Sequence, residues 1–472
     1  MALTSSNVTS GFIDLATYDE LEKYLYGGPD STAYFVRITR KSTWFTQVPM
    51  ILSKANGTPA FGQEFSASIS RAGDYLLNTW LRVTFPAVTL NAGNQYGVNG
   101  RLRWTRNLMH NLIRDCQLTF NDLVAARFDN YHLDFWSAFT VPAGKRNGYN
   151  NMIGNINDLT APHAPGLAIG PTLPSVTLNL PLPFFYARDS GVALPTAALP
   201  YNDMKIVFSL RDWSELLILD NSGVAGAGTI ARATPVPGAA GVGDLSTGTP
   251  TISRADVWAT YAIVSNEERK RMGCNPRDIV IEQCQTAPRQ SYTPATVTQQ
   301  SFDIRFSHAV KALFFAVRNS TFIGEWSDYT TSSPYDAGGA AINFTPPGAS
   351  DPILQTSLIY ENTNRLSQMG SDYYSLVNPY FNAPVIPLET GYHLYSYSLD
   401  FISLDPMGST NYGKLTNVSI VPEASQSSVT AANGAGAAGS GQDFPQKFEF
   451  IVTAVNNNII RIAGGALGFP VL

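Results

Sequence analysis

The sequence predicts an all-β fold, because strand signals run along most of the chain and helix signals are rare. Two segments alternate apolar and polar residues over the length of a strand, HLYSYSLDF at 393–401 and KFEFIVTAV at 447–455. This period of two is typical of a strand with one buried face. Further segments are rich in β-branched or aromatic residues and end in turn formers, at 176–185, 204–210, 257–264 and 312–319. Many short strands joined by Gly- and Pro-rich turns favour a sandwich or a barrel.

The alternation also predicts which side chains share a face. In the first segment these are Tyr395, Tyr397, Leu399 and Phe401. In the second they are Phe448, Phe450, Val452 and Ala454.

A short helix is predicted at residues 17–26. Thr17 and Glu20 have the spacing of a capping box, and Gly27 and Gly28 provide a C-terminal stop. Tyr18, Leu21 and Leu25 follow at i, i+3 and i+7, so they share one face. A helix of about nine residues does not persist alone in water, so we expect it to dock on a partner.

Three explanations for this N-terminal helix are a signal peptide, a membrane anchor and an arm that packs on a partner. Residues 1–22 contain no Lys or Arg and no long apolar stretch, which disfavours a signal peptide. A helix bound to a membrane surface is usually basic. This helix carries Asp19, Glu20 and Glu22 against Lys23, so the arm is favoured.

A second helix is predicted at 266–273, NEERKRMG. Asn266 can cap it, the two Glu residues suit the positive end of the helix dipole, and Lys270 and Arg271 suit the other end.

The composition bounds the possible functions. Of 472 residues only 14% are charged and 11% are aromatic, against about 25% charged in an average globular protein. Few charges and many aromatic residues suit a protein that covers much of its surface with neighbours. The net charge of −5 argues against neutralising phosphates as the main role. Three Cys residues without a CxxC motif fit reduced thiols in a cytoplasmic setting.

The Gly-, Ala- and Pro-rich segment 221–250 lies near mid-chain and is the predicted boundary between strand-rich halves. We therefore predict an N-terminal arm at 1–33, a first sandwich at 34–220, a linker or loop at 221–250 and a second sandwich at 251–472. Further loops are predicted at 91–100, 327–350 and 424–441. A weak echo between HNLIRDCQLTFN (110–121) and HAVKALFFAVRN (308–319) suggests duplication of one jelly-roll-sized unit of eight strands.

Several strings imitate functional motifs. GSTNYGKL (408–415) matches G-x-x-x-x-G-K, but Leu415 stands where Ser or Thr would hold magnesium, and TNVSIV after it is strand-like. We predict a turn between strands there. GAGAAG (434–439) matches G-x-G-x-x-G inside a low-complexity stretch, which indicates a loop rather than a dinucleotide site. RLRWTR (101–106) interleaves Arg with Trp, and a solvated sheet edge or a subunit contact is favoured over binding of single-stranded nucleic acid.

No catalytic, cofactor-binding or metal-binding residue is predicted. None of the five His residues has a His or Cys partner at ligand spacing, and HExxH and G-x-S-x-G are absent from the sequence. His110 and His308 open strand-like runs, where structural histidines are common. Cys116 is predicted to be a buried small apolar residue.

Long stretches of the sequence resemble the major capsid proteins of iridoviruses, a double jelly-roll capsid protein family of nucleocytoplasmic large DNA viruses. The resemblance covers the chain from end to end. The matching stretches are GFIDLATYDELEKYLYGG (11–28), PAFGQEFS (59–66), NMIGNINDL (151–159), LPLPFFYARDSGVALPTAALPYND (180–203), FSHAVKAL (306–313), YHLYSYSLD (392–400), GSTNYGKLTN (408–417) and NNIIRIAGGALGFPVL (457–472).

This resemblance implies two consecutive eight-stranded jelly-roll β-sandwiches with long surface loops and a short N-terminal helical arm. It implies a structural protein, not an enzyme, without cofactors. Homotrimeric capsomers of pseudo-hexagonal outline would tile a large icosahedral shell over an internal lipid membrane. The implied localisation is the virion capsid shell, assembled in the host cytoplasm.

The implied partners are the chain itself, neighbouring capsomers and minor capsid proteins, close to the internal membrane and without direct contact to nucleic acid. In this family the N-terminal segment lies on the inner side of the shell. Tyr18, Leu21 and Leu25 are therefore the predicted inner-face arm contacts. Two alternatives stay open: a jelly-roll carbohydrate-binding or cupin-like protein, and receptor binding by surface loops.

Overall fold

The computed structural model describes residues 2–94, 100–160, 172–220, 230–232, 244–246, 248–332, 350–434 and 445–470. The chain forms two compact units, residues Met1–Trp44 and Phe45–Leu472. Most of the loops predicted at 91–100, 221–250 and 327–350, and the GAGAAG stretch after Gly434, lie outside the described residues. The described helices include none that is both long and apolar enough to span a membrane.

The N-terminal unit contains two helices, α1 (Ala2–Ala16) and α2 (Glu20–Leu25). The predicted capping box of α2 is wrong by two residues. Asp19 is the N-cap and pairs with Glu22 in the box, because Thr17 is engaged elsewhere. The Thr17 hydroxyl donates to the Asp14 carbonyl at 2.6 Å, at the end of α1. The 15-residue α1 lacks the charge and cap signals that would have predicted it.

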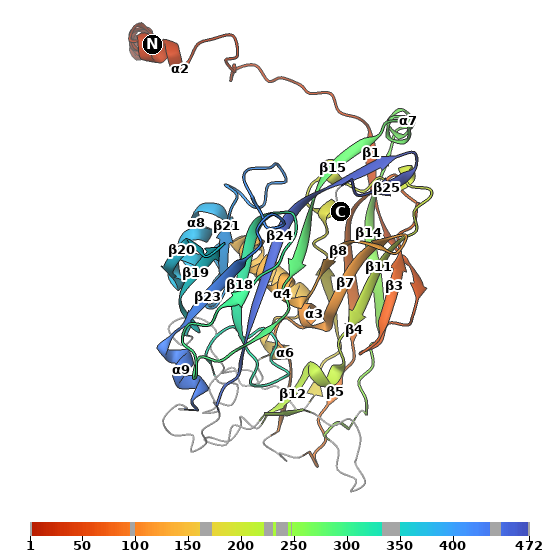
Figure 1. Cartoon of the computed structure of the whole chain (residues 1–472). Helices are drawn as coiled ribbons and strands as arrows, with labels where there is room; N and C mark the ends of the chain where they lie inside the picture. The colour runs from red at the N-terminus through yellow and green to blue at the C-terminus, as the bar shows by residue number, and fades with distance from the viewer. Residues whose placement is uncertain are drawn as a thin grey trace. The chain divides into compact units, whose positions relative to one another are not determined.

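The first group of strands in the body forms two main sheets (Figure 1). One has the order β1-β14-β4-β10 and the other β2-β3-β11-β7-β8. Their bounds are β1 (Phe45–Ile51), β2 (Ser53–Asn56), β3 (Glu64–Ser68), β4 (Tyr75–Phe85), β7 (Ile113–Phe120), β8 (Leu123–Phe128), β10 (Val176–Pro181), β11 (Met204–Leu210) and β14 (Arg254–Val264). Short sheets are made by β6 (Arg101–Trp104), β12 (Leu217–Asp220) and β13 (Ile230–Arg232), and by β5 (Val88–Thr89) and β9 (Thr172–Leu173).

The second group also forms two sheets. One has the order β15-β24-β18-β21, with β16, β22 and β25 attached to it, and the other has the order β17-β23-β19-β20. Their bounds are β15 (Arg277–Thr286), β16 (Gln290–Tyr292), β17 (Phe302–Asp303), β18 (Ala309–Asn319), β19 (Ile353–Tyr360), β20 (Thr363–Gly370), β21 (His393–Ser396), β22 (Thr410–Asn411), β23 (Val418–Ala424), β24 (Phe448–Ala463) and β25 (Ala466–Gly468).

The two groups have the same topology. The main strands, in chain order, are β1, β3, β4, β7, β8, β10, β11 and β14 in the first group. In the second group they are β15, β17, β18, β19, β20, β21, β23 and β24. In both groups the first, eighth, third and sixth strands form one sheet, and the second, seventh, fourth and fifth form the other. This is the eight-stranded jelly roll, so the predicted all-β double jelly roll is confirmed.

The sheets group the strands differently from the predicted sequence limits. Strand β14 lies beyond residue 250, yet it pairs with β1 and β4 and completes the first sandwich. Segment 221–250 therefore falls between the seventh and eighth strands, and the limits 34–220 and 251–472 do not match the sheets. The sequence echo between residues 110–121 and 308–319 does not mark equivalent strands. Strand β7 is the fourth strand of the first sandwich, whereas β18 is the third strand of the second.

Helices fill the connections between strands. They are α3 (Leu108–Leu112), α4 (Asn130–Thr140), α5 (Ala143–Ile153), α6 (Asn157–Thr160), α7 (Asn266–Cys274), the π-helical η6 (Tyr373–Val377), α8 (Asn378–Asn382) and α9 (Gln426–Ala432). Short 3-10 turns lie at Phe185–Ala187 (η2), Ser190–Val192 (η3), Thr196–Ala198 (η4) and Trp213–Glu215 (η5). Helix α7 is the predicted second helix, with Ser265 rather than Asn266 as its N-cap.

Two apolar clusters make up the core. The smaller cluster contains only residues of the second sandwich, between Ala287 and Ala454. The larger cluster fills the first sandwich and continues onto the outer face of the β15-β24-β18-β21 sheet. Strand β18 accordingly alternates, with Phe314 in the larger cluster and Phe315 in the smaller. The predicted shared face of Phe448, Phe450, Val452 and Ala454 is confirmed within the smaller cluster.

The strand predicted at 393–401 is only half right. Strand β21 ends at Ser396, and the hydroxyls of Ser396 and Ser398 bond to backbone carbonyls two residues ahead, at 2.7 and 3.1 Å. These local bonds compete with a continued ladder. Leu399 is consequently 78% exposed, and Phe401 belongs to the other core cluster from Tyr395.

Candidate functional site

The seam between the two sandwiches is built around α3 and α4, which lie between the two groups of strands (Figure 1). Helix α4 directly follows β8, and Asp129 caps it by accepting the His132 amide at 2.9 Å. The aromatic residues of α4 read as strand formers in the sequence, but packing against the second sandwich overrides that propensity. The phenyl rings of Phe135 and Phe139 lie 5.9 and 5.5 Å from that of Phe314 on β18.

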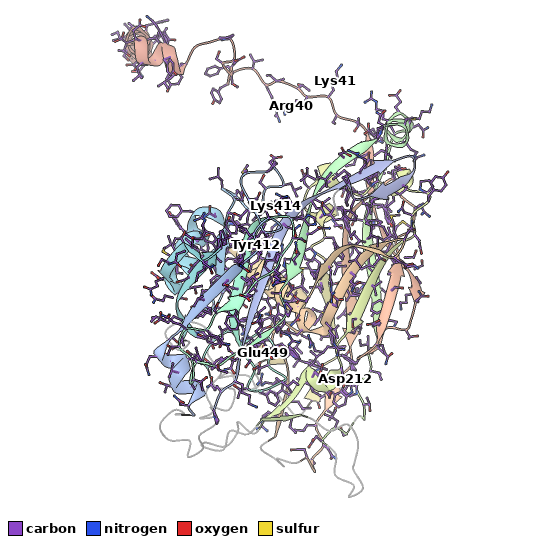
Figure 2. All side chains as sticks on the ribbon, in the orientation of Figure 1. Arg40, Lys41, Asp212, Tyr412, Lys414 and Glu449 are labelled. Carbon is purple, nitrogen blue, oxygen red and sulfur yellow. The ribbon has the colours of Figure 1, made fainter. Side chains whose placement is uncertain are left out.

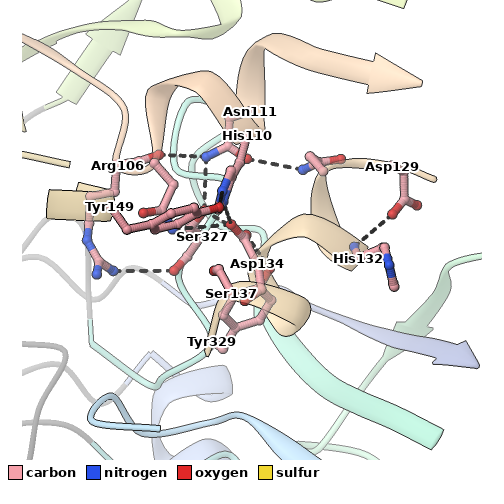
Figure 3. Close-up of polar contacts among 12 residues, drawn as sticks. Arg106, His110, Asn111, Asp129, His132, Asp134, Ser137, Tyr149, Ser327 and Tyr329 are labelled. Carbon is pink, nitrogen blue, oxygen red and sulfur yellow. Dashed lines mark hydrogen bonds and ion pairs between the residues drawn. The ribbon is translucent and has the colours of Figure 1, made fainter. Parts of the chain in front are cut away.

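Asp134 on α4 is the polar centre of the seam and is fully buried (Figure 3). Its carboxylate accepts hydrogen bonds from Ser327 Oγ at 2.9 Å and Tyr329 OH at 2.8 Å, both from the second sandwich. From the first sandwich, Asn107 Nδ2 donates at 3.2 Å and His110 Nδ1 lies at 2.7 Å. Four partners satisfy a buried carboxylate that would otherwise be costly.

His110 lies in α3 rather than in the predicted strand. Its Nε2 is 2.6 Å from the Tyr149 hydroxyl, so both ring nitrogens have protein partners. Neighbouring Asn111 donates to Ser327 Oγ at 2.9 Å and accepts from Asn130. These residues hold the two sandwiches together, and their role is structural.

Ion pairs flank this centre. Arg103 pairs with Glu325 and Arg106 with Glu389 across the seam. The predicted solvated edge or subunit contact at RLRWTR is therefore wrong for these two arginines, which the chain itself buries. On the other side of α4, Glu282 on β15 pairs with Arg188 at 2.7 Å and with Lys311. Removing one partner of such a buried pair would leave an unpaired charge in the seam, which is strongly destabilising.

A cavity of about 30 Å³ lies beside α4, between the sandwiches, and is lined by His132, Trp136, Arg188, Glu282 and Cys284 among others. A water molecule needs about 10–15 Å³ of such space, so the cavity is too small for an organic cofactor. Burial, assisted by the charge of Arg188, lowers the pKa of His132 to about 3. The ring is therefore neutral at physiological pH.

Two arrangements resemble catalytic sites but lack their geometry. In the first, Ser371 Oγ and the Asp351 carboxylate both approach Nε2 of His393, at 2.6 and 2.8 Å. In a hydrolase triad the carboxylate holds Nδ1, but here Nδ1 lies near the Phe315 carbonyl at 3.3 Å. The described ranges hold no group of three His, Cys, Asp or Glu residues suited to a metal ion.

The second arrangement is GSTNYGKL, which folds as β22 followed by a turn and then β23. Tyr412 and Lys414 lie in that turn (Figure 2). The predicted turn between strands is confirmed, because β23 stands where a phosphate-binding loop needs a helix.

Cys116 is fully buried, as predicted, and burial raises the pKa of its thiol.

The predicted arm contacts, Tyr18, Leu21 and Leu25, are all exposed. Leu21 and Leu25 are one turn apart in α2, whereas Tyr18 precedes the helix. Helix α1 adds exposed Phe12, Ile13 and Leu15, which the sequence reading missed. An extended segment with Arg40 and Lys41 follows α2 (Figure 2). The inner-face role of these residues stays a prediction.

Two jelly rolls in succession, joined by a buried seam, define the class of double jelly-roll proteins. Sequence comparison places the chain within this class. Residues 33–264 match the profile of the major capsid protein N-terminus, and residues 268–468 match that of the large eukaryotic DNA virus major capsid protein. The chain belongs to this family of major capsid proteins and is a structural component of the virion capsid, not an enzyme.

Close relatives support the same assignment. The chain is 66% identical to the major capsid protein of Costelytra zealandica iridescent virus and 64% identical to that of Invertebrate iridescent virus 6, over the full length of each. Among solved structures, a chain of the PBCV-1 virus capsid has a TM-score of 0.71 at 19% identity, over 93% of this chain and 100% of that one. The Faustovirus major capsid protein has a TM-score of 0.67 at 13% identity, over 92% and 93%. The carbohydrate-binding or cupin-like alternative finds no support in these matches.

Proposed function

We propose that three copies of this chain form a homotrimeric capsomer of pseudo-hexagonal outline, and that capsomers tile an icosahedral shell over an internal membrane. The observation that carries the proposal is the identical strand order of the two sandwiches. One chain supplies two nearly equivalent blocks, so three chains supply six. Head-to-tail contacts between such blocks close into a ring when the rotation at each step is right.

The composition and surface support assembly with further copies and neighbouring capsomers. Only 14% of residues are charged, and many large apolar side chains of the body are exposed, among them Phe45, Ile51, Tyr380 and Phe381. Exposed apolar patches mark protein interaction sites. The three cysteines are free, which is compatible with assembly in the reducing host cytoplasm.

The N-terminal arm is proposed to contact minor capsid proteins on the inner side of the shell, near the membrane. Exposed apolar residues lie on its two helices and on the link between them, including Tyr18 in the link and Leu21 and Leu25 in α2. A helix such as α2, with six residues, needs a partner to persist. Direct binding of nucleic acid is not part of the proposal, since Arg103 and Arg106 are buried in ion pairs and the net charge is −5.

The mass of the purified full-length chain in solution tests the capsomer. Light scattering across a hundredfold range of concentration should give about three times the 51.2 kDa of one chain. Electron microscopy of the same sample should show particles with six-lobed outlines. A chain that stays monomeric over the whole range would overturn the proposal.

A further inference from the structure

The contact inside one chain provides a template for the contact between chains. Within the chain, the helix that follows the fifth strand of the first sandwich lies on the outer face of the second sandwich. That helix is α4, and its Phe135 and Phe139 cover Phe314 on β18. Trp136 packs edge-on against Phe401 at 6.0 Å. Both partners, Phe314 and Phe401, are fully buried as a result.

The second sandwich has the matching helix, and the part of the chain that the structure describes leaves its equivalent side chains exposed. Residues of η6 and α8 follow the fifth strand, β20, as α4 follows β8. Leu376, Val377, Tyr380 and Phe381 repeat the spacing of Phe135, Trp136 and Phe139, with neighbouring pairs one turn apart. These four side chains are between 42% and 74% exposed. We call them the η6–α8 face.

The first sandwich has the matching sheet surface. Trp80 is the sixth residue of the eleven-residue β4, and Phe314 is the sixth of the eleven-residue β18. Trp80 pairs in register with Trp258 on β14, their rings stack at 6.0 Å, and both are partly exposed. Ile51 on β1 lies beside Trp258, and Pro181 on β10 lies beside Trp80. These four residues form an apolar row across the sheet, which we call the Trp80 row, and none belongs to a core cluster.

The edge strands of the two sandwiches also correspond, as the helix and the sheet surface do. Inside the chain, the fifth strand of the first sandwich lies near the first strand of the second, and Gln283 Nε2 on β15 donates to the Ala125 carbonyl on β8 at 2.7 Å. The corresponding strands for a contact between chains are β20 and β1. Both are edge strands of their sheets and expose most of their residues.

We propose that the η6–α8 face of one copy docks on the Trp80 row of the next copy, with β20 beside β1, and so repeats between chains the α4–Phe314 contact. The inference rests on the proposed trimer and assigns its surfaces. The contact is heterologous, so each copy uses one surface of each kind, and the three contacts close the ring. Aromatic residues at its centre suit a stable protein interface.

Site-directed cross-linking tests this pairing. Exposed Cys274 is first changed to Ser. In that background the double variant Ile51→Cys/Phe381→Cys, which leaves both tryptophans in place, is treated with a short bismaleimide. We expect covalent dimers and trimers that each single variant fails to give. Tyr201→Cys/Phe381→Cys is the matched control, because Tyr201 is 75% exposed beside Gly465 and outside both surfaces.

A charge placed on the η6–α8 face provides a second measurement. Tyr380→Glu/Phe381→Glu should raise at least tenfold the concentration at which half of the trimer dissociates, with an unchanged circular dichroism spectrum. Tyr201→Glu should leave that concentration unchanged. Trimers that neither cross-link through the 51/381 pair nor weaken with the Glu pair would overturn the inference and leave the trimer standing.

Two other outcomes would also overturn the proposed pairing. Cross-links that join whole trimers, and increase with trimer concentration, would assign the η6–α8 face to neighbouring capsomers and overturn the pairing. A wild-type chain that never exceeds monomer mass would overturn both the inference and the proposed function.

Discussion

The two sandwiches share one strand order but differ in what covers them. The outer face of the β15-β24-β18-β21 sheet is buried under α4, so Phe314 is inaccessible to solvent. The same face of the β1-β14-β4-β10 sheet leaves Trp80 and Trp258 partly exposed and Ile51 45% exposed. The first strands differ in the same way, since Ile279 and Ile281 of β15 are buried and Phe45 and Val48 of β1 are exposed.

Side chains at equivalent positions of the two sandwiches that differ in burial are candidates for contact with another copy of the chain. Antiparallel sheets commonly leave one face in water, and that face is then polar. A tryptophan pair on such a face does not follow the pattern. In the second sandwich the equivalent face is apolar because the chain covers it, so the apolar character of the first supports the proposed cover by a neighbouring copy.

The sharpest test of this comparison substitutes the two equivalent sheet residues in a chain that carries Tyr380→Glu/Phe381→Glu and is diluted until it is monomeric. Phe314→Ala should lower the free energy of unfolding by about 3–5 kcal/mol, because it opens a cavity in the seam. Trp80→Ala should cost less, about 1–2 kcal/mol, because Trp80 is only partly buried in the monomer and its removal leaves a hollow open to solvent rather than a closed cavity. Chemical denaturation followed by fluorescence and circular dichroism measures both. Equal losses would mean that the two faces are not differently covered.

The polar seam gives the next largest effect. Asp134→Asn should cost about 2–3 kcal/mol, since bonds to the carboxylate become bonds to a neutral amide and one of the four donors then faces an NH₂ group. Tyr329→Phe, which removes a single donor, should cost about 1 kcal/mol. Thermal unfolding of both variants provides the measurement. A loss for Asp134→Asn no larger than for Tyr329→Phe would show that Asp134 does not centre the network.

Acid should weaken the seam through His132. Its folded-state pKa of about 3 lies below the ordinary value of 6.5, so between these values the unfolded chain binds more protons than the folded chain. Stability should therefore fall as the pH drops below about 6.5, by about 2–3 kcal/mol at pH 4.5 from this group alone. His132→Phe should remove that part of the decline, because the ring is buried among Phe128 and Trp136.

Denaturation at pH 7.5, 6 and 4.5 compares wild type with His132→Phe. Parallel declines for the two proteins would contradict a neutral buried histidine.

Asp328 acts with the opposite sign, because burial raises its pKa to about 7. Its unfavourable charge is relieved as the pH falls through 7, so Asp328→Asn should stabilise the protein above pH 7 and less so at pH 5.

The sequence predicted the parts of the fold that local pattern determines. Strand β11 matches its predicted bounds, 204–210, because alternate burial shaped its composition. The end of the first sandwich could not be predicted, because β14 joins its sheet only through pairing with β1 and β4, far away in sequence. Helix α4 was missed since its aromatic residues favour strands, whereas packing against distant residues such as Phe314 favours the helix.

The proposed docking surfaces could not be predicted from the sequence either. Trp80 and Trp258 are 178 positions apart, and neither lies in a motif. Only the register between β4 and β14 brings them together. Asp134 gave no signal either, because its four partners come from two segments, 107–110 and 327–329, that only the fold brings to α4.

The smallest effect on stability is expected for substitutions in the N-terminal arm. The arm belongs to a compact unit of its own, so it can be compared with the two sandwiches of the body. Leu21→Ser/Leu25→Ser should change the unfolding free energy of the body by less than about 0.5 kcal/mol, because both side chains are exposed. The trimer mass should also stay unchanged, since the Trp80 row and the η6–α8 face lie in the body. Closed particles, counted by electron microscopy after expression with the minor capsid proteins, should decrease, because the arm is proposed to bind those proteins. Glu20→Gln in the same helix is the matched control. Normal particle numbers for the double Ser variant would contradict a role of these residues on the inner face.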